Sequence, residues 1–113
     1  MNHQPEKVSE FLESFIVEEL EIQSARARGQ ELGSNEPSSG TGAFLAMMVR
    51  ATQGKNIVEL GTGTGVGTLW LASELDESAT LTSIDSEAEH IQLARDACDE
   101  MEISSHQIGR AHV

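Results

Sequence analysis

The stretch Asn56–Leu75, NIVELGTGTGVGTLWLASEL, decides how this chain folds. It opens with a short apolar run, Ile57–Leu60, between Gly54 and Gly61, and such a run is typical of a buried strand. Glycine then occupies alternate positions from 61 to 67, and an apolar segment at helical spacing follows. The stretch therefore predicts a strand, a glycine turn and a helix.

A turn of alternating glycines at the carboxyl end of a strand can carry a ligand on its backbone. Glycine adopts conformations with positive φ and has no Cβ to keep another surface away. The free N–H groups at the start of the following helix lie beside such a turn. The sequence therefore predicts a cofactor shelf at residues 61–67.

The glycine spacing separates three classes of cofactor site. A P-loop needs a lysine directly after a glycine of the turn, and this turn has none. The dinucleotide fingerprint needs a third glycine where this chain has Val66 or Thr68, so that class is disfavoured but stays open. Glu59, two residues before the first glycine, would repel a pyrophosphate and suits a cationic ligand. S-adenosylmethionine, with its sulfonium and ammonium groups, fits this third class.

A second predicted strand, Ala79–Asp85, ends in an acid 20 residues after Gly65. An acid at the tip of the second strand is placed to accept hydrogen bonds from ribose hydroxyls. Asp85 therefore fits a cofactor that contains adenosine.

The remaining segments complete an α/β pattern. An apolar face at spacings of three and four predicts an N-terminal helix, and a Ser-x-x-Glu capping box at Ser86 predicts the start of a later one. The expected segments are a helix over Glu6–Ala27, a loop over Gly29–Thr41, a buried helix over Ala43–Ala51, a helix from Val66 to Leu75, a helix from Glu87 to about Met101 and a strand from Ile108.

These elements predict an incomplete doubly wound, Rossmann-like parallel sheet of about three strands behind N-terminal helices. Right-handed crossovers give the strand order third, second, first. The outer edge of the first strand is then open, and an open edge can pair with another chain.

Composition narrows the function classes. The net charge of −12, from 7 basic and 19 acidic side chains, argues against nucleic acid and against an anionic membrane surface. The sequence contains no apolar run of the roughly 20 residues that span a bilayer, and its N-terminus lacks a signal-peptide pattern. A cytoplasmic protein is expected. No metal site is predicted, and the single Cys98 is expected in the core.

The motifs together resemble those of class I S-adenosylmethionine-dependent O-methyltransferases of the catechol and caffeoyl-CoA type. The residues that carry the resemblance are Val58–Gly65, Leu81–Asp85 and the upstream loop Glu36–Gly42. The resemblance covers nearly all of this chain but only about the first half of the family's catalytic domain. It implies a fragment with a helical segment over residues 1–34 and the N-terminal half of the cofactor-binding domain over residues 35–113.

The resemblance also implies the cofactor-binding residues, which are Pro37, Glu59, Gly61, Thr62, Gly67, Asp85 and Ser86. Glu59 would meet the methionine end of S-adenosylmethionine, Gly61 and Thr62 would form the shelf, and Asp85 with Ser86 would bind the ribose. Pro37 would make a backbone contact. No catalytic residue can be carried over.

The family transfers a methyl group to a hydroxyl of a small molecule, in some members with a divalent metal whose ligands lie in the half absent here. The N-terminal helix would be a lid or dimerisation element by resemblance, and a core-covering helix otherwise. A homodimer could form.

Two alternatives stay open: a catalytically inactive remnant that binds an adenosine ligand or oligomerises through the open sheet edge, and, less favoured, a nicotinamide-dependent enzyme.

Overall fold

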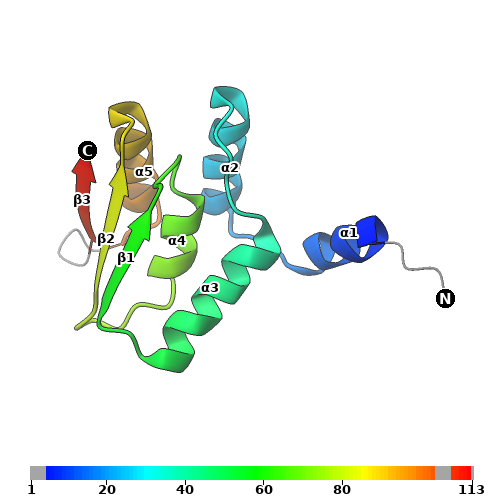
Figure 1. Cartoon of the computed structure of the whole chain (residues 1–113), viewed down its shortest axis with the longest axis horizontal. Helices are drawn as coiled ribbons and strands as arrows, with labels where there is room; N and C mark the ends of the chain where they lie inside the picture. The colour runs from blue at the N-terminus through cyan, green and yellow to red at the C-terminus, as the bar shows by residue number, and fades with distance from the viewer. Residues whose placement is uncertain (1–4, 104–107, 113) are drawn as a thin grey trace.

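The computed structural model describes residues 5–103 and 108–112. Three helices precede the first strand, and strands and helices then alternate (Figure 1). In chain order the elements are α1 (Pro5–Phe15), α2 (Leu20–Leu32), α3 (Ser39–Thr52), β1 (Asn56–Leu60), α4 (Val66–Ala72), β2 (Thr80–Asp85), α5 (Ala88–Glu100) and β3 (Ile108–His112). The α/β class expected from the sequence is confirmed.

The three strands form one parallel sheet in the order β1-β2-β3. Leu60 at the end of β1 lies opposite Ile84, one residue before the end of β2. The carboxyl ends of the two strands therefore meet at one edge of the sheet, where the glycine turn and Asp85 follow them. The expected strand order is confirmed, and β1 occupies an outer position in the described sheet.

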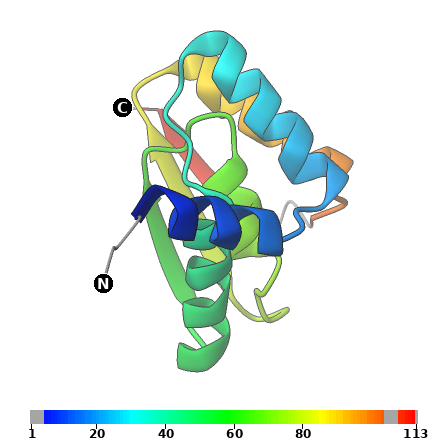
Figure 2. The same ribbon diagram turned by 90° about the vertical axis from the view of Figure 1, so that its right-hand side faces the viewer.

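The helices cover one face of the sheet, as Figures 1 and 2 show. Side chains alternate along β1, so that Ile57 and Glu59 are partly buried whereas Val58 and Leu60 are 64% and 81% exposed. Because consecutive residues of a strand point to opposite faces, Val58 and Leu60 belong to the other face. Within the described residues no helix covers that face.

The core lies between the sheet and the helices α2, α4 and α5. Ile22, Leu69, Leu81 and Cys98 are almost fully buried there and belong to one apolar cluster. Full burial of one such aliphatic side chain contributes about 1.5–3 kcal/mol. The expected core position of Cys98 is confirmed.

The single helix expected over Glu6–Ala27 is wrong, because the chain leaves the helix after Phe15 and enters α2 at Leu20. The break lets Glu18 reach other elements: its carboxylate pairs with Arg26 at 2.8 Å and accepts a 2.8 Å hydrogen bond from the Trp70 indole Nε1. A continuous amphipathic pattern does not reveal such long-range bonds.

The first helix, α1, projects from the body of the molecule (Figure 1). Its apolar residues are largely exposed, with Phe11 at 63% and Phe15 at 74%. The opposite side holds α1 to the start of α3, where the Glu13 carboxylate accepts hydrogen bonds from the backbone N–H groups of Ser39 and Gly40. The apolar face of α1 therefore does not cover the core in this structure.

Several expected boundaries are wrong by a few residues. The loop expected over Gly29–Thr41 is shorter, since α2 continues to Leu32, Gly33 ends it in the left-handed conformation, and α3 begins at Ser39. The helix that follows the glycine turn ends at Ala72 and not at Leu75. The division of the chain at residue 34 stays a prediction.

The capping box expected at Ser86 is also wrong. The N-cap of α5 is Glu87, which makes no capping hydrogen bond through its side chain. Asp85 takes part of this role, since its Oδ1 accepts a 2.8 Å hydrogen bond from the Glu87 backbone N–H. The turn between β2 and α5 is thus organised by the acid at the strand tip.

Gly42 allows α3 and α4 to pack closely, because a Cβ at this position would overlap the indole ring of Trp70. We expect Gly42→Ala to lower the free energy of unfolding by about 1–3 kcal/mol, the usual cost of overpacking. The measurement is urea denaturation followed by circular dichroism. Gly40→Ala on the same helix is the control, since its Cβ would lie 3.2 Å from Glu13 Oε1 and would not overlap a ring. Equal losses in the two variants would contradict the packing argument.

Candidate cofactor site

The glycine turn follows β1 directly, as the sequence predicts. Gly63 and Gly65 have φ values of +55° and +103°, which favour glycine because other residues are strained there. A Cβ at Gly65 would also lie 3.0 Å from Ala94 Cα on α5. Gly65 therefore fixes both the start of α4 and its distance from α5.

The two threonines of the turn point into the protein. Thr62 and Thr64 are buried, at 1% and 0% exposure. The Thr62 hydroxyl shares a 2.6 Å hydrogen bond with Ser83 on β2, and the Thr64 hydroxyl donates to the carbonyl oxygen of Ala25 on α2 at 2.7 Å. Thr62 can therefore offer a ligand its backbone, while its side chain ties the turn to the sheet.

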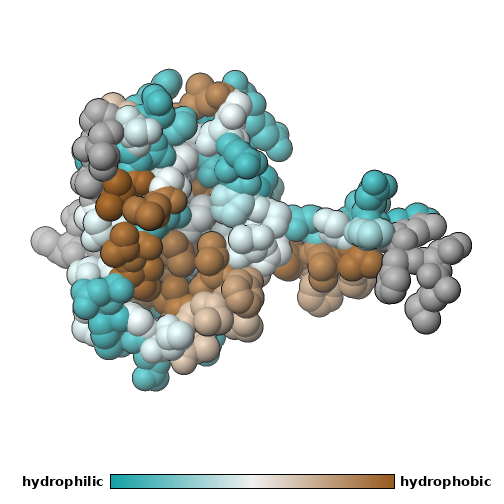
Figure 3. Space-filling view, viewed as in Figure 1, coloured by the Kyte–Doolittle hydropathy of each residue, from teal (hydrophilic) through white to brown (hydrophobic). Residues whose placement is uncertain are grey.

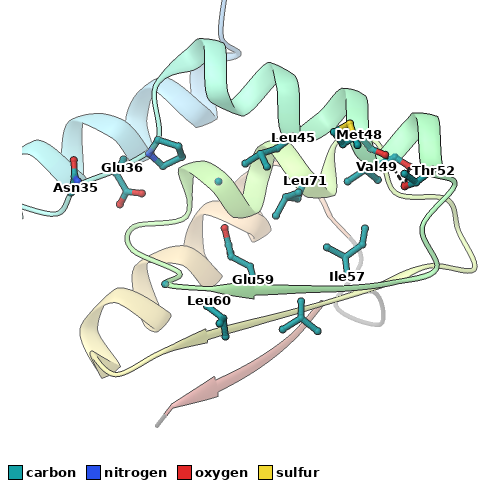
Figure 4. A pocket seen from close by; sticks show the side chains of 14 residues that line it. Asn35, Glu36, Leu45, Met48, Val49, Thr52, Ile57, Glu59, Leu60 and Leu71 are labelled. Atoms are coloured by element: carbon teal, nitrogen blue, oxygen red, sulfur yellow. Dashed lines mark hydrogen bonds between the residues drawn. The ribbon is translucent and has the colours of Figure 1, made fainter.

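Glu59 projects from β1 toward the helices (Figure 4). Its Oε1 accepts hydrogen bonds of 2.5 Å from the hydroxyls of Thr68 and Ser83. A Cβ at Gly67 would lie 2.6 Å from Glu59 Oε2, so the glycine at this position makes room for the carboxylate. Gly67, expected as a cofactor residue at the helix start, thus has a direct contact with Glu59.

Burial raises the pKa of Glu59 above its ordinary value. The hydrogen bonds from Ser83 and Thr68 oppose this shift, and the nearby charges of Glu36 and Asp85 add to it. A partly desolvated carboxylate among like charges gains stability when a cation approaches. The electrostatics of Glu59 therefore favour a positively charged ligand.

Asp85 lies at the end of β2 and binds the backbone of the glycine turn. Its Oδ2 accepts a 2.8 Å hydrogen bond from the Gly63 backbone N–H, and His90 Nδ1 lies 3.6 Å from its Oδ1. Burial works to raise the pKa of Asp85, but hydrogen bonds from Glu87 and Gly63, together with His90, hold it below its usual value. Asp85 is therefore ionised at neutral pH. Ser86 follows it at an exposed position.

A pocket of about 610 Å³ opens beside Glu59, between β1 and the helices α3 and α4 (Figure 4). Four of the expected site residues line it, namely Pro37, Glu59, Gly61 and Gly67. Its other walls are mainly apolar and include Leu45, Ile57 and Leu71. Thr62, Asp85 and Ser86 do not line the pocket; Asp85 binds the turn at Gly63, two residues after the pocket residue Gly61.

The sequence reasoning did not assign two residues that organise this site. Glu36, which also lines the pocket, accepts a 2.5 Å hydrogen bond from the backbone N–H of Thr64, and its Oε1 shares the hydroxyl hydrogen of Thr64 with Ala25, at 2.6 Å. Arg26 donates from Nη1 to the Pro37 carbonyl oxygen at 2.7 Å. The position of Glu36 beside Pro37 was a usable signal, whereas nothing in the sequence pattern connects Arg26 with Pro37.

Two absences can be stated for the part of the chain that the structure describes. It contains no cluster of three His, Cys, Asp or Glu side chains that could hold a metal ion. It also contains no helix that is both long and apolar enough to cross a bilayer.

The fold is that of an α/β protein with a glycine turn at the carboxyl end of its first strand, and comparison with known proteins identifies its family. The profile of an O-methyltransferase family matches residues 6–109. The chain therefore belongs to this O-methyltransferase family.

A candidate O-methyltransferase from Mycobacterium sp. strain KMS is 40% identical over 88 residues, which are 78% of this chain and 40% of that protein. A crystal structure of a candidate O-methyltransferase from Klebsiella pneumoniae matches with a TM-score of 0.80 at 25% identity, over 92% of this chain and 48% of that one. The O-methyltransferase TomG from Streptomyces achromogenes, solved in complex with SAM, shares the fold with a TM-score of 0.84 at 23% identity, over 97% of this chain and 51% of that one. The chain thus spans about two fifths to one half of these proteins.

Replacing Glu59 by glutamine tests the cost of its buried charge. The raised pKa means that the folded state binds a proton more tightly than the unfolded state. Unfolding free energy of the wild type should therefore rise relative to Glu59→Gln as pH falls from neutral through the raised pKa toward the ordinary glutamate range. At neutral pH the variant should be the more stable protein.

Urea denaturation of both proteins across this pH range measures the difference. Asp85, whose pKa is lowered, acts with the opposite sign in both proteins, and its charge interaction with Glu59 is part of the measured difference. A difference between wild type and Glu59→Gln that does not change with pH would contradict the assignment of a raised pKa.

Proposed function

We propose that this chain is the cofactor-binding half of an S-adenosylmethionine-dependent O-methyltransferase that acts on a hydroxyl of a small molecule. The observation that carries the proposal is the partly buried Glu59 carboxylate, which faces a pocket beside the glycine turn. The membership of the O-methyltransferase family supports it. A cytoplasmic location is part of the proposal.

The residues present fit a cationic cofactor. Glu36 and Glu59 line the pocket, Asp85 binds the same glycine turn at Gly63, and the described residues that line the pocket include no Lys, Arg or His. A phosphate would meet like charges there, whereas a sulfonium or ammonium group would meet opposite ones. The apolar wall formed by Leu45 and Leu71 suits the uncharged part of a ligand.

Each part of the chain has a role in this proposal. When bound, S-adenosylmethionine supplies a methyl group activated by a sulfonium sulfur. Glu59 holds the charged methionine end, the backbone of Gly61 and Thr62 supports the nucleoside, and Asp85 with Ser86 binds the ribose. Pro37 contributes a backbone contact, and Gly67 keeps space for Glu59. Binding in one fixed orientation is how these residues would contribute to methyl transfer.

Asp85→Ala tests the cofactor site. We expect it to weaken binding of S-adenosylmethionine by about 1–3 kcal/mol, because a polar partner of the ligand is lost. Isothermal titration calorimetry at a temperature where circular dichroism shows both proteins folded is the measurement. Asp99→Ala, an exposed acid on α5, is the control and should bind as the wild type does. Unchanged affinity in Asp85→Ala would sink the proposed ribose contact, and tighter binding of NAD than of S-adenosylmethionine would favour the nicotinamide alternative.

A second candidate function is association through β1, either as a homodimer or with another partner. Brown, apolar surface gathers over β1 and α3 in Figure 3. It includes the exposed Val58 and Leu60 of β1 and Met47 of α3. An apolar edge strand with free backbone groups favours pairing with another strand.

Leu60→Lys tests this candidate, since a lysine at an edge opposes strand pairing. If β1 mediates association, the wild type should show a mass above the 12.2 kDa monomer that rises with concentration, and the variant should shift toward the monomer. Size exclusion with light scattering gives these masses. Leu32→Lys, at an exposed position of α2, should leave the mass unchanged. A wild type that stays monomeric at every concentration would rule the candidate out.

A further inference from the structure

Glu36 connects the loop before α3 to the glycine turn. Its Oε1 accepts a hydrogen bond from the Thr64 backbone N–H at 2.5 Å and from the Ser34 hydroxyl at 3.0 Å. It also lies 2.6 Å from the Thr64 hydroxyl, whose single hydrogen it shares with the Ala25 carbonyl oxygen. Hydrogen bonds to a carboxylate are stronger than those between neutral groups. The side chain therefore links three segments at a single oxygen: its own loop, the turn and, through Thr64, the α2 residue Ala25.

Two glycines make the space that Glu36 occupies. A Cβ at Gly29 on α2 would lie 2.7 Å from Glu36 Cγ, and a Cβ at Gly63 would lie 2.7 Å from its Oε2. Both distances are too short for real atoms, so a side chain at either position would displace the carboxylate. The chain is thus shaped around Glu36 on two sides, which an incidental surface contact does not require.

A second carboxylate holds the same turn from the other side. Asp85 Oδ2 accepts from the Gly63 N–H, and Glu36 Oε1 accepts from the next N–H along the chain, that of Thr64. A turn with glycine at positions 61, 63 and 65 has many accessible conformations when it is free. The two carboxylates select one of them.

Glu36 also fixes its neighbour in the pocket wall. Pro37 follows directly, its carbonyl oxygen is held by Arg26, and its Cγ would lie 3.5 Å from a Cβ at Gly67. The loop is therefore anchored on both sides of the Glu36–Pro37 peptide bond, directly over the start of α4. Loss of the Glu36 anchor would release both the turn and the loop that face the pocket.

We propose that Glu36 is a positioning residue of the cofactor site, which holds the Gly63–Thr64 turn and Pro37 in the geometry that binds S-adenosylmethionine. The inference rests on the proposed function and adds to it a residue for which neither the sequence motifs nor the family assignment gives a role. Glu36 acts through the backbone that it orders. The feature needed for this role is a side-chain oxygen that accepts the hydrogen bond from the Thr64 N–H.

Two variants separate this role from simple loss of charge. Glu36→Ala removes the acceptor and should raise the dissociation constant for S-adenosylmethionine about tenfold or more, as expected when a charge-assisted hydrogen bond is lost. Glu36→Gln keeps an oxygen that can accept from Thr64 and should remain within about threefold of the wild type. Glu31→Ala removes one exposed carboxylate from α2 and should bind as the wild type does. Calorimetry at a temperature where all four proteins are folded gives the constants.

Amide hydrogen exchange provides a readout that does not need the ligand. The Thr64 N–H should exchange faster in Glu36→Ala than in Glu36→Gln, while amides of β2 keep their wild-type protection. Wild-type affinity in Glu36→Ala, or equal exchange at Thr64 in all variants, would overturn the inference and leave the proposed function intact. A folded wild type that binds no S-adenosylmethionine would overturn the proposed function and this inference with it.

Discussion

Two carboxylates accept hydrogen bonds from one glycine turn, and the geometry of the site depends on these bonds. Asp85 accepts from Gly63 and Glu36 accepts from Thr64, so consecutive N–H groups of the turn are bound by acids of the same chain. Asp85 in turn orders the start of α5 through Glu87. The turn that begins α4 and the cap that begins α5 are therefore set by one side chain at the tip of β2.

These hydrogen bonds also distinguish the site from phosphate-binding glycine turns. In those sites free backbone N–H groups receive the phosphate oxygens. Here the N–H groups of Gly63 and Thr64 are already satisfied by carboxylates, and further negative charge would be repelled. The sequence lacks the lysine and the glycine spacing of phosphate-binding turns, and in the structure the N–H groups of the turn are bound by carboxylates. The sequence pattern and the hydrogen bonds of the turn thus disfavour a phosphate ligand for independent reasons.

The order of the elements could be predicted from sequence, because each rests on local patterns. The strand Asn56–Leu60, the glycine turn and the acid at Asp85 are set by short-range spacing, and the structure places them where expected. The break between α1 and α2 could not be predicted, because the Glu18 contact that accompanies it is with Trp70, 52 residues away. The role of Glu36 could not be predicted for the same reason, since its partner Thr64 is 28 residues away in the sequence. Site residues chosen by motif alone therefore omitted the side chains that hold the motif in shape.

The one-sided sheet limits what this half of the fold can do by itself. Glu59 lines the pocket from the face that the helices cover, and Val58 and Leu60, which line it at the edge of β1, expose apolar surface toward the other face. In a doubly wound fold the strand beyond β1 creates the crevice where ligands bind. The described elements provide one wall of that crevice, with the charge and the hydrogen-bond acceptors for a cofactor. The acidic groups Glu36 and Glu59 that line this pocket come from the loop before α3 and from β1 itself, so this wall is built by the described half of the fold.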